Sequence, residues 1–213
     1  MLTYDDKLHK YFYDNRELPS VTTILKSEGL IDYGNIPHAV LEKAKARGKY
    51  VHKAVEFINE NDLDFNTLSK EYKPFVEAYQ EFVNVTRFTP ISIEQKVVNI
   101  KTKGLEYAGT LDATGILYDK KIIIDYKTGL TMPAQAGIQL AAYELCLPER
   151  HKRYGLLLRK NGTYKLVAFT DHSDYDRWLE ILASFFKREK ENQEHVINQG
   201  RVHGKNVSYK AIL

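Results

Sequence analysis

Apolar residues recur along the chain at two spacings, and together these predict a mixed α/β fold. Alternating or β-branched runs predict strands over 91–100, 105–118, 121–128, 153–159 and 164–170. Apolar residues three or four positions apart predict longer helices over 37–61, 71–85 and 173–192. Shorter helices are expected after Ser20, and from Thr131 or Pro133 through Leu147. We therefore expect an α/β domain with a mixed β-sheet flanked by helices.

The chain has 213 residues, which suits one α/β domain with additions. We divide it into an N-terminal hairpin and short helix (1–36), a core (37–170), and a C-terminal helix and tail (171–213). Periodicity directs these helical side chains to the core: Val40, Ala44, Val51, Val55, Ile58, Phe75, Tyr79, Phe82, Trp178, Leu182 and Phe185. On strand 91–100, strict alternation places Ile91, Ile93, Gln95 and Val97 on one face.

The stretch over 109–129 carries the most specific polar pattern. A two-residue loop at 119–120 would give the pairs Tyr118–Lys121, Thr114–Asp125 and Asp112–Lys127. Because directly opposed residues share a face of the sheet, Asp112, Asp125 and Lys127 would then converge on one patch. A four-residue loop keeps this parity, whereas a three-residue loop without a bulge would break it.

Two carboxylates and a lysine on one rigid surface suit the hydrolysis of a phosphodiester. Asp112 and Asp125 can hold Mg²⁺ or Mn²⁺ through oxygen ligands and leave positions open for water and phosphate. Lys127 can orient that water or steady developing charge. The alternative is a surface ion-pair ladder without catalytic function.

The predicted helix over 37–61 carries a basic face made by Lys45, Lys49, His52 and Lys53. The pattern alone favours a solvated face as the explanation of that stripe. Gly48 is unfavourable inside a helix, and close backbone approach to the sheet or to substrate would compensate.

A second basic segment surrounds Asn161-Gly162, which predicts a type I′ hairpin turn. Arg159 and its basic neighbours could contact phosphates there, or could protect an exposed edge strand from aggregation.

Four motifs follow one another in a recognisable order. His52 lies in R-G-K-Y-V-H, G-x-x-D spans 109–112, D-Y-K-T-G spans 125–129, and Gln139-x-x-x-Tyr143 follows. This order resembles the PD-(D/E)xK nucleases, and within them the RecB-type branch, over 47–143. The opening segment with Leu-Pro-Ser-Val-Thr is similar to small phage and mitochondrial RecB-type exonucleases.

The resemblance implies a restriction-endonuclease-like core and metal-dependent hydrolysis of DNA, most simply as an exonuclease in replication, recombination or repair. It implies metal ligation by Asp112, Asp125, His52 and the backbone carbonyl of Tyr126, with Lys127 positioning the water. Glu94 would be an additional acidic group, or merely an exposed strand residue in an ion pair. Gln139 and Tyr143 would lie beside substrate DNA, or would simply pack the helix.

Cations near these motifs are further candidate DNA contacts: Lys45, Arg47, Lys49 and Arg159. Tyr50 and Tyr143 are candidate stacking partners for unpaired bases, which favours single-stranded ends or overhangs as substrate.

Composition narrows the remaining possibilities. The net charge of +3 limits any nucleic-acid footprint to a local patch. The single cysteine, Cys146, excludes a four-cysteine iron–sulfur cluster within the chain, although some RecB-type relatives carry one. We recognise no signal peptide, membrane-spanning run or lipidation motif, and we expect a cytoplasmic protein.

The sequence also lacks a Walker A motif, so unwinding would need a partner helicase or another recombination or replication protein. Two alternatives stay open for the function. One is a catalytically silent DNA-binding module on the same fold, and the other is a metal-dependent hydrolase of small phosphoesters.

Overall fold

A computed structural model of the chain describes the backbone of residues 1–202 and the side chains of residues 1–196. Within that range the strands are β1 (Leu2–Asp5), β2 (Lys10–Tyr13), β3 (Arg16–Leu18), β4 (Thr89–Asn99), β5 (Tyr107–Leu117), β6 (Lys120–Lys127), β7 (Lys152–Leu158) and β8 (Tyr164–Phe169). The α-helices are α1 (Val21–Ser27), α2 (His38–Asn59), α3 (Lys73–Thr86), α4 (Ala136–Glu144) and α5 (Ser173–Val202), and Phe65–Thr67 is a 3₁₀ turn. No helix in this range is long and apolar enough to cross a membrane.

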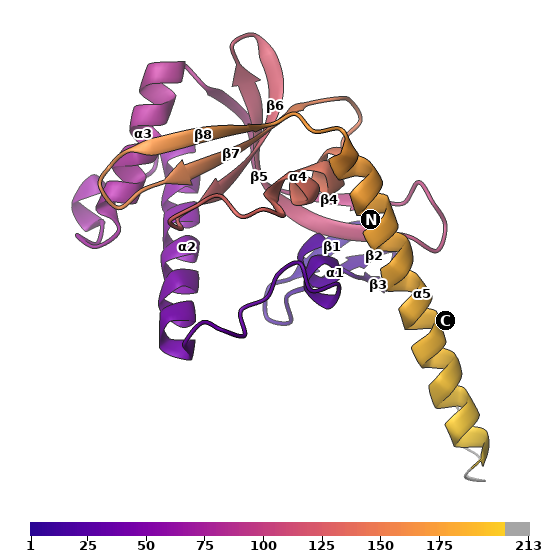
Figure 1. Cartoon of the computed structure of the whole chain (residues 1–213). Helices are drawn as coiled ribbons and strands as arrows, with labels where there is room; N and C mark the ends of the chain where they lie inside the picture. Colours follow the sequence, from indigo (N-terminus) through magenta and orange to yellow (C-terminus); the bar gives the residue numbers. More distant parts are fainter. Residues whose placement is uncertain (203–213) are drawn as a thin grey trace.

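The main sheet has five strands in the order β4-β5-β6-β7-β8 (Figure 1). Strands β6 and β7 are parallel and joined through α4, whereas the other neighbours are antiparallel. Strands β1, β2 and β3 form a separate three-stranded antiparallel sheet, here called the N-terminal meander. The expected α/β architecture with a mixed sheet is confirmed.

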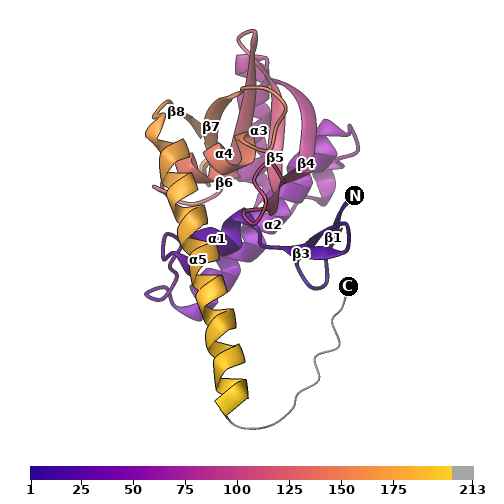
Figure 2. The same cartoon turned by 90° about the vertical axis from the view of Figure 1, so that its right-hand side faces the viewer.

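Strand β6 lies at the centre of the main sheet and is buried on both faces. Ile122 and Ile124 pack in a cluster with side chains of α2 and α3. Ile123 packs in a second cluster with side chains of α1, α4 and α5. The helices therefore cover opposite faces of the sheet, as Figures 1 and 2 show. Polar residues that continue this strand, beginning with Asp125, are thus held on a rigid support.

The hairpin between β5 and β6 turns one residue earlier than predicted, so a given residue of β5 pairs two positions earlier along β6. Tyr118 and Asp119 both have positive φ, at 48° and 57°, as a two-residue type I′ turn requires. Leu117 pairs with Lys120, and Thr114 pairs with Ile123 rather than with Asp125. The predicted pairs are wrong, but a shift of two residues keeps every side chain on its predicted face.

Strand β4 departs from the predicted alternation. Its pairing with β5 shifts register between Pro90 and Ser92, and Glu94 adopts a left-handed φ of 48°. Ile91 and Gln95 are exposed, while Ile93 and Val97 pack in different clusters. The single apolar face predicted for this strand is therefore wrong, because the register shift after Pro90 and the left-handed backbone at Glu94 interrupt the alternation of its side chains.

Helices α2 and α3 begin and end within about two residues of their predicted bounds, and α1 has the predicted Ser20 cap, which accepts from Thr23 N. Helix α4 begins at Ala136, later than predicted. The prediction that Val40 lies in the core is wrong, because the residue lies near the start of α2 and 58% of its surface is exposed.

Three further expectations need correction. The N-terminal segment forms three strands rather than one hairpin. The turn between β7 and β8 is not type I′, because Gly162 has positive φ and Asn161 does not. Helix α5 continues beyond Asn192 to Val202 and extends away from the body (Figures 1 and 2). The part of the predicted tail over 203–213 lies outside the described residues.

A buried ion pair joins β7 to α5. Arg153 lies 2.9 Å from Asp174, and its guanidinium also donates to the carbonyls of Gly137 and Asp171. Both side chains are almost fully buried. The pair therefore anchors α4, β7 and α5 to one another, and Arg153 is not available to a phosphate.

We expect Arg153→Ala to lower the free energy of unfolding by about 3–5 kcal/mol, because it leaves Asp174 buried without its partner. Urea denaturation followed by circular dichroism measures the loss. Lys152→Ala, at an exposed neighbour on the same strand, is the matched control and should change stability by less than about 0.5 kcal/mol. A comparable loss in the two variants would contradict the assigned role.

Candidate metal centre

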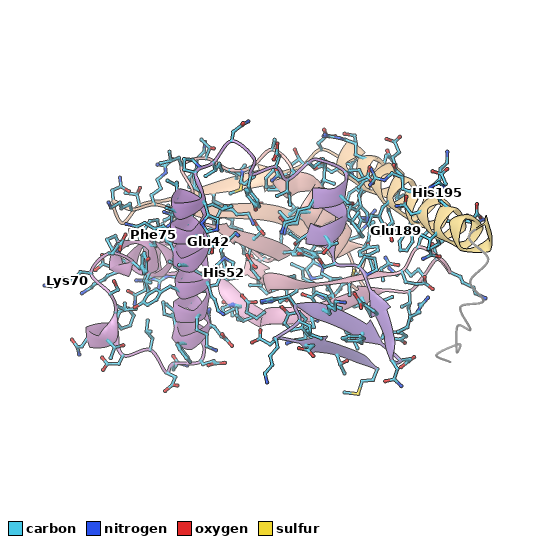
Figure 3. All side chains as sticks on the ribbon, turned by 90° about the horizontal axis from the view of Figure 1, so that it is seen from below. Glu42, His52, Lys70, Phe75, Glu189 and His195 are labelled. Carbon is cyan, nitrogen blue, oxygen red and sulfur yellow. The ribbon has the colours of Figure 1, made fainter. Side chains whose placement is uncertain are left out.

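Three side chains from different elements meet in a group that could hold a metal ion: His52 of α2, Glu94 of β4 and Asp112 of β5. Their ligand atoms all lie within 4.8 Å of one another. His52 Nδ1 lies 3.4 Å from Glu94 Oε1 and 3.5 Å from Asp112 Oδ1. Figure 3 shows His52 on the side of α2 that faces the sheet.

Local structure explains why the three converge. Val51 and Val55 are fully buried and pack α2 against the sheet, which directs the neighbouring His52 to the same interface. Glu94 lies between Ile93 and Gln95, whose partners on β5 flank Asp112. Its left-handed φ is a strained conformation for a non-glycine residue, of order 1–3 kcal/mol. That strain is retained at the point where the carboxylate reaches His52.

Tyr126 fixes the orientation of two of these groups through its backbone. Its N–H donates to Asp112 Oδ2 at 2.6 Å, and its carbonyl oxygen lies 3.1 Å from His52 Nε2. A histidine that donates one ring N–H to a carbonyl presents its other nitrogen as a ligand. Nδ1 is therefore the nitrogen that faces Glu94 and Asp112. In this arrangement the Tyr126 carbonyl, expected as a metal ligand, holds the histidine.

Asp125 and Lys127 lie beside this group as a buried pair. Lys127 Nζ donates to Asp125 Oδ1 at 2.8 Å, and Asp125 is 3% exposed. Asp125 is not one of the three residues whose ligand atoms meet. Its other oxygen, Oδ2, is buried and has no hydrogen-bond partner.

The charged groups influence one another strongly. Burial raises the pKa of Asp125, and the nearby Asp112 carboxylate raises it further against the opposing effect of Lys127. Burial lowers the pKa of Lys127, but Asp125 and Asp112 outweigh that effect and leave it raised. Burial also lowers the pKa of His52, yet the carboxylates of Asp112 and Glu94 raise it to about 9.

The balance of charge fits a bound cation. Three carboxylates, of Glu94, Asp112 and Asp125, share this region with two cationic groups, His52 and Lys127. Buried carboxylates need a cation or hydrogen-bond donors for each oxygen, and the Asp125 Oδ2 atom has neither. Oxygen ligands with one imidazole suit Mg²⁺ or Mn²⁺. The residues present therefore fit the expected ion, although its identity is not fixed by them.

The predicted pair on α4 lies close by but is largely buried. Gln139 Nε2 donates to Tyr143 Oη at 3.3 Å. Tyr143 is 5% exposed and packs in the cluster formed with α1 and α5. A Cβ at Gly109 would lie 2.5 Å from the Tyr143 ring, so the glycine of G-x-x-D makes room for this tyrosine. The expectation that Tyr143 stacks on a base is not met in this arrangement, because its ring is packed inside the protein.

The predicted basic residues have varied surroundings. Lys45 pairs with Glu42 and Lys53 pairs with Glu56. The other stacking candidate, Tyr50, accepts a hydrogen bond from Ser69 N.

Arg47 is turned towards the sheet. Its Nε donates to Thr128 Oγ1 at 3.2 Å, and its guanidinium lies over the Phe75 ring at 5.5 Å. It therefore ties α2 to the chain segment that follows Lys127. Arg159 is exposed in the turn between β7 and β8.

A cleft of about 760 Å³ opens beside the metal centre. It lies between α2, the main sheet and the N-terminal meander, and its lining residues include His52, Glu94, Lys49, Tyr4 and Tyr11. Tyr11 Oη lies 2.8 Å from Thr110 Oγ1 and holds the meander against β5. The sequence offers no local signal that the N-terminal meander forms one wall of the cleft, because the contact joins residues far apart in the chain.

A scan against protein-family models finds no match for this chain, and a search of curated proteins finds no matching sequence.

The affinity of the site for Mn²⁺ should rise with pH up to about 9, because His52 must lose a proton to act as a ligand. At neutral pH we expect release of about one proton per bound ion, which corresponds to roughly a tenfold gain in affinity per pH unit. Calorimetric titration in two buffers with different ionisation enthalpies counts the protons. His52→Gln is the control and should remove most of the pH dependence. Binding without proton release would show that His52 is not a ligand.

Proposed function

We propose that this protein is a Mg²⁺- or Mn²⁺-dependent nuclease that hydrolyses DNA phosphodiester bonds. The observation that carries the proposal is the convergence of His52, Glu94 and Asp112 beside the buried Asp125–Lys127 pair. A bound ion would polarise the phosphoryl group and lower the pKa of a water molecule. His52, Glu94, Asp112 and Asp125 are the residues that would hold it.

Lys127, Asp125 and Arg47 have separate roles beside the proposed ion. Lys127 is protonated at neutral pH, because the carboxylates beside it raise its pKa. It therefore donates hydrogen bonds to a water molecule or to a phosphoryl oxygen, and it does not remove a proton. Asp125 fixes the Lys127 ammonium group through its Oδ1 atom. Arg47 fixes the segment after Lys127 through Thr128, which keeps the end of β6 in place.

The four-motif order and the fold support the restriction-endonuclease-like, RecB-type assignment. Asp112, Asp125 and Lys127 lie on β5 and β6, in a mixed sheet with a helix connecting its parallel strands, and His52 and Glu94 join them from α2 and β4. We propose exonucleolytic action on single-stranded ends or overhangs, without sequence readout. Phosphate-dominated binding of this kind weakens with salt. A helicase or recombination protein would supply the strand separation that this chain has no motif to perform.

The second candidate function is the hydrolysis of small phosphoesters, and the size of the cleft supports it. A volume of about 760 Å³ is within the range of small-molecule sites, and the lining carries acids as well as lysines. Hydrolysis of bis-p-nitrophenyl phosphate without cleavage of DNA would support this candidate.

End-labelled single- and double-stranded DNA incubated with Mg²⁺ or Mn²⁺ tests the nuclease directly. We expect mononucleotides or short oligonucleotides from single strands, no cleavage with a chelator, and at least about 100-fold slower cleavage by Asp112→Asn and Asp125→Asn. Melting curves and circular dichroism must show that each variant remains folded. Normal activity in either folded variant would sink the assignment, and DNA binding without cleavage by the wild type would favour a silent binding module.

Lys127→Ala should keep Mn²⁺ and DNA affinity but reduce kcat by about 100-fold, because its hydrogen bond acts on the transition state. Single-turnover kinetics at saturating DNA separate the two effects. Lys120→Ala, at the exposed start of the same strand, is the matched control. If DNA affinity falls in proportion to the rate, Lys127 is a phosphate contact and has no role in turnover.

A further inference from the structure

We infer that the cleft beside the metal centre holds one nucleic-acid strand. The sugar–phosphate backbone of this strand passes α2 at Gly48, and its bases lie against the N-terminal meander. This inference rests on the proposed function, because it assigns the binding subsite that adjoins the same metal centre.

Gly48 is the first observation. It lies inside the 22-residue helix α2, where glycine is less favourable than alanine. A Cβ built at this position meets no protein atom within 4 Å. The sequence-based expectation of close approach to the sheet is therefore wrong, and packing within the described chain gives no reason for glycine.

The position of Gly48 beside the cleft explains why a glycine occurs here, which packing does not explain. Gly48 lines the cleft, one helical turn before His52 on the same face of α2. A side chain there would project into the space next to the metal centre. The missing Cβ therefore leaves room for a ligand that approaches the helix backbone closely, as glycine does at phosphate sites.

The meander supplies the facing wall. Tyr4 and Tyr11 line the cleft opposite α2, with ring centroids 4.7 Å apart. The Tyr11–Thr110 hydrogen bond fixes this wall to β5. Tyr11 is 8% exposed, so Tyr4 is the ring of this wall that an unpaired base can stack on, without sequence readout. Duplex DNA keeps its bases stacked inside, so this wall favours a single strand.

Two lysines of the lining lack carboxylate partners among the ion pairs of the described side chains. They are Lys49 on α2 and Lys96 on β4, and Lys96 Nζ lies 5.9 Å from the Tyr4 ring centroid. The lining acids Glu56 and Glu94 are paired with Lys53 and His52. Asp6 is the remaining lining acid and belongs to the meander. Phosphates are therefore attracted to the side formed by α2 and β4, and bases face Tyr4 of the meander.

Gly48→Ala and Gly48→Leu test this arrangement by filling the gap. Gly48→Ala should raise the melting temperature by about 2–4 °C, because alanine favours the helix and meets no clash. It should weaken the binding of a fluorescein-labelled oligothymidylate by roughly tenfold, and Gly48→Leu should weaken it more. Fluorescence anisotropy in Ca²⁺ measures affinity, with a gel to confirm that the strand stays intact. Mn²⁺ affinity should stay unchanged.

Ala46→Leu is the matched control. Ala46 is exposed on α2, two residues from Gly48 and so on the opposite side of the helix, and it does not line the cleft. This variant should bind the oligonucleotide as the wild type does.

Unchanged affinity in both Gly48 variants would overturn the inference, and metal-dependent DNA cleavage by them would leave the nuclease assignment intact. A fall in kcat without a fall in affinity would also overturn it. If the wild type binds no oligonucleotide but hydrolyses bis-p-nitrophenyl phosphate, both the inference and the nuclease function fail. Weaker binding by the Gly48 variants supports the inference even if no cleavage is found.

Discussion

The burial of carboxylates at the centre of the sheet is the constraint on which the rest of this structure depends. Asp125 is almost completely buried, and only one of its oxygens has a partner. Removing a charged group from water costs several kcal/mol unless it is paired and hydrogen-bonded. Such a group persists only where the surrounding fold is stable enough to hold it. The apolar triplet Ile122–Ile124, covered by helices on both faces, provides that support immediately before Asp125.

The same constraint explains why the other charged residues are placed as they are. Lys127 pairs with Asp125, and His52 lies between Glu94 and Asp112 with its second nitrogen held by the Tyr126 carbonyl. Each cation thus offsets carboxylates that would otherwise repel one another. The arrangement still has one carboxylate more than it has cations. A divalent ion held by His52, Glu94 and Asp112 would balance the acids, which is why the geometry favours a possible metal centre over a surface ion-pair ladder.

The sequence predicts much of this because the relevant information is local. Side-chain alternation depends only on parity, so Asp112, Asp125 and Lys127 share a face even though the predicted turn was wrong by one position on each strand. Helices α2 and α3 follow from periodicity, since their buried faces repeat at helical spacing. The same method misplaced Val40, because periodicity marks a face of a helix and does not show how far along it the neighbouring elements reach.

The remaining features of the site depend on contacts between distant segments. The hydrogen bond between Tyr11 and Thr110 joins residues 99 positions apart, and that between Arg47 and Thr128 joins residues 81 apart. No periodicity or turn signal encodes such pairs, so the cleft wall formed by the meander could not be derived from the sequence. The left-handed φ of Glu94 likewise has no signal in the alternation of the strand.

Three residues that break local rules lie beside the cleft and the metal centre, and this supports a functional role for the place. Glu94 has an unfavourable φ for its residue type, Gly48 weakens the middle of a helix, and Asp125 has an unsatisfied buried oxygen. Each of these features costs stability, and departures of this kind are expected at functional sites. Glu94 and Gly48 both line the cleft, and Asp125 interacts electrostatically with Asp112 and His52 beside it. Three departures from local rules beside one cleft support the proposal that a ligand and an ion bind there.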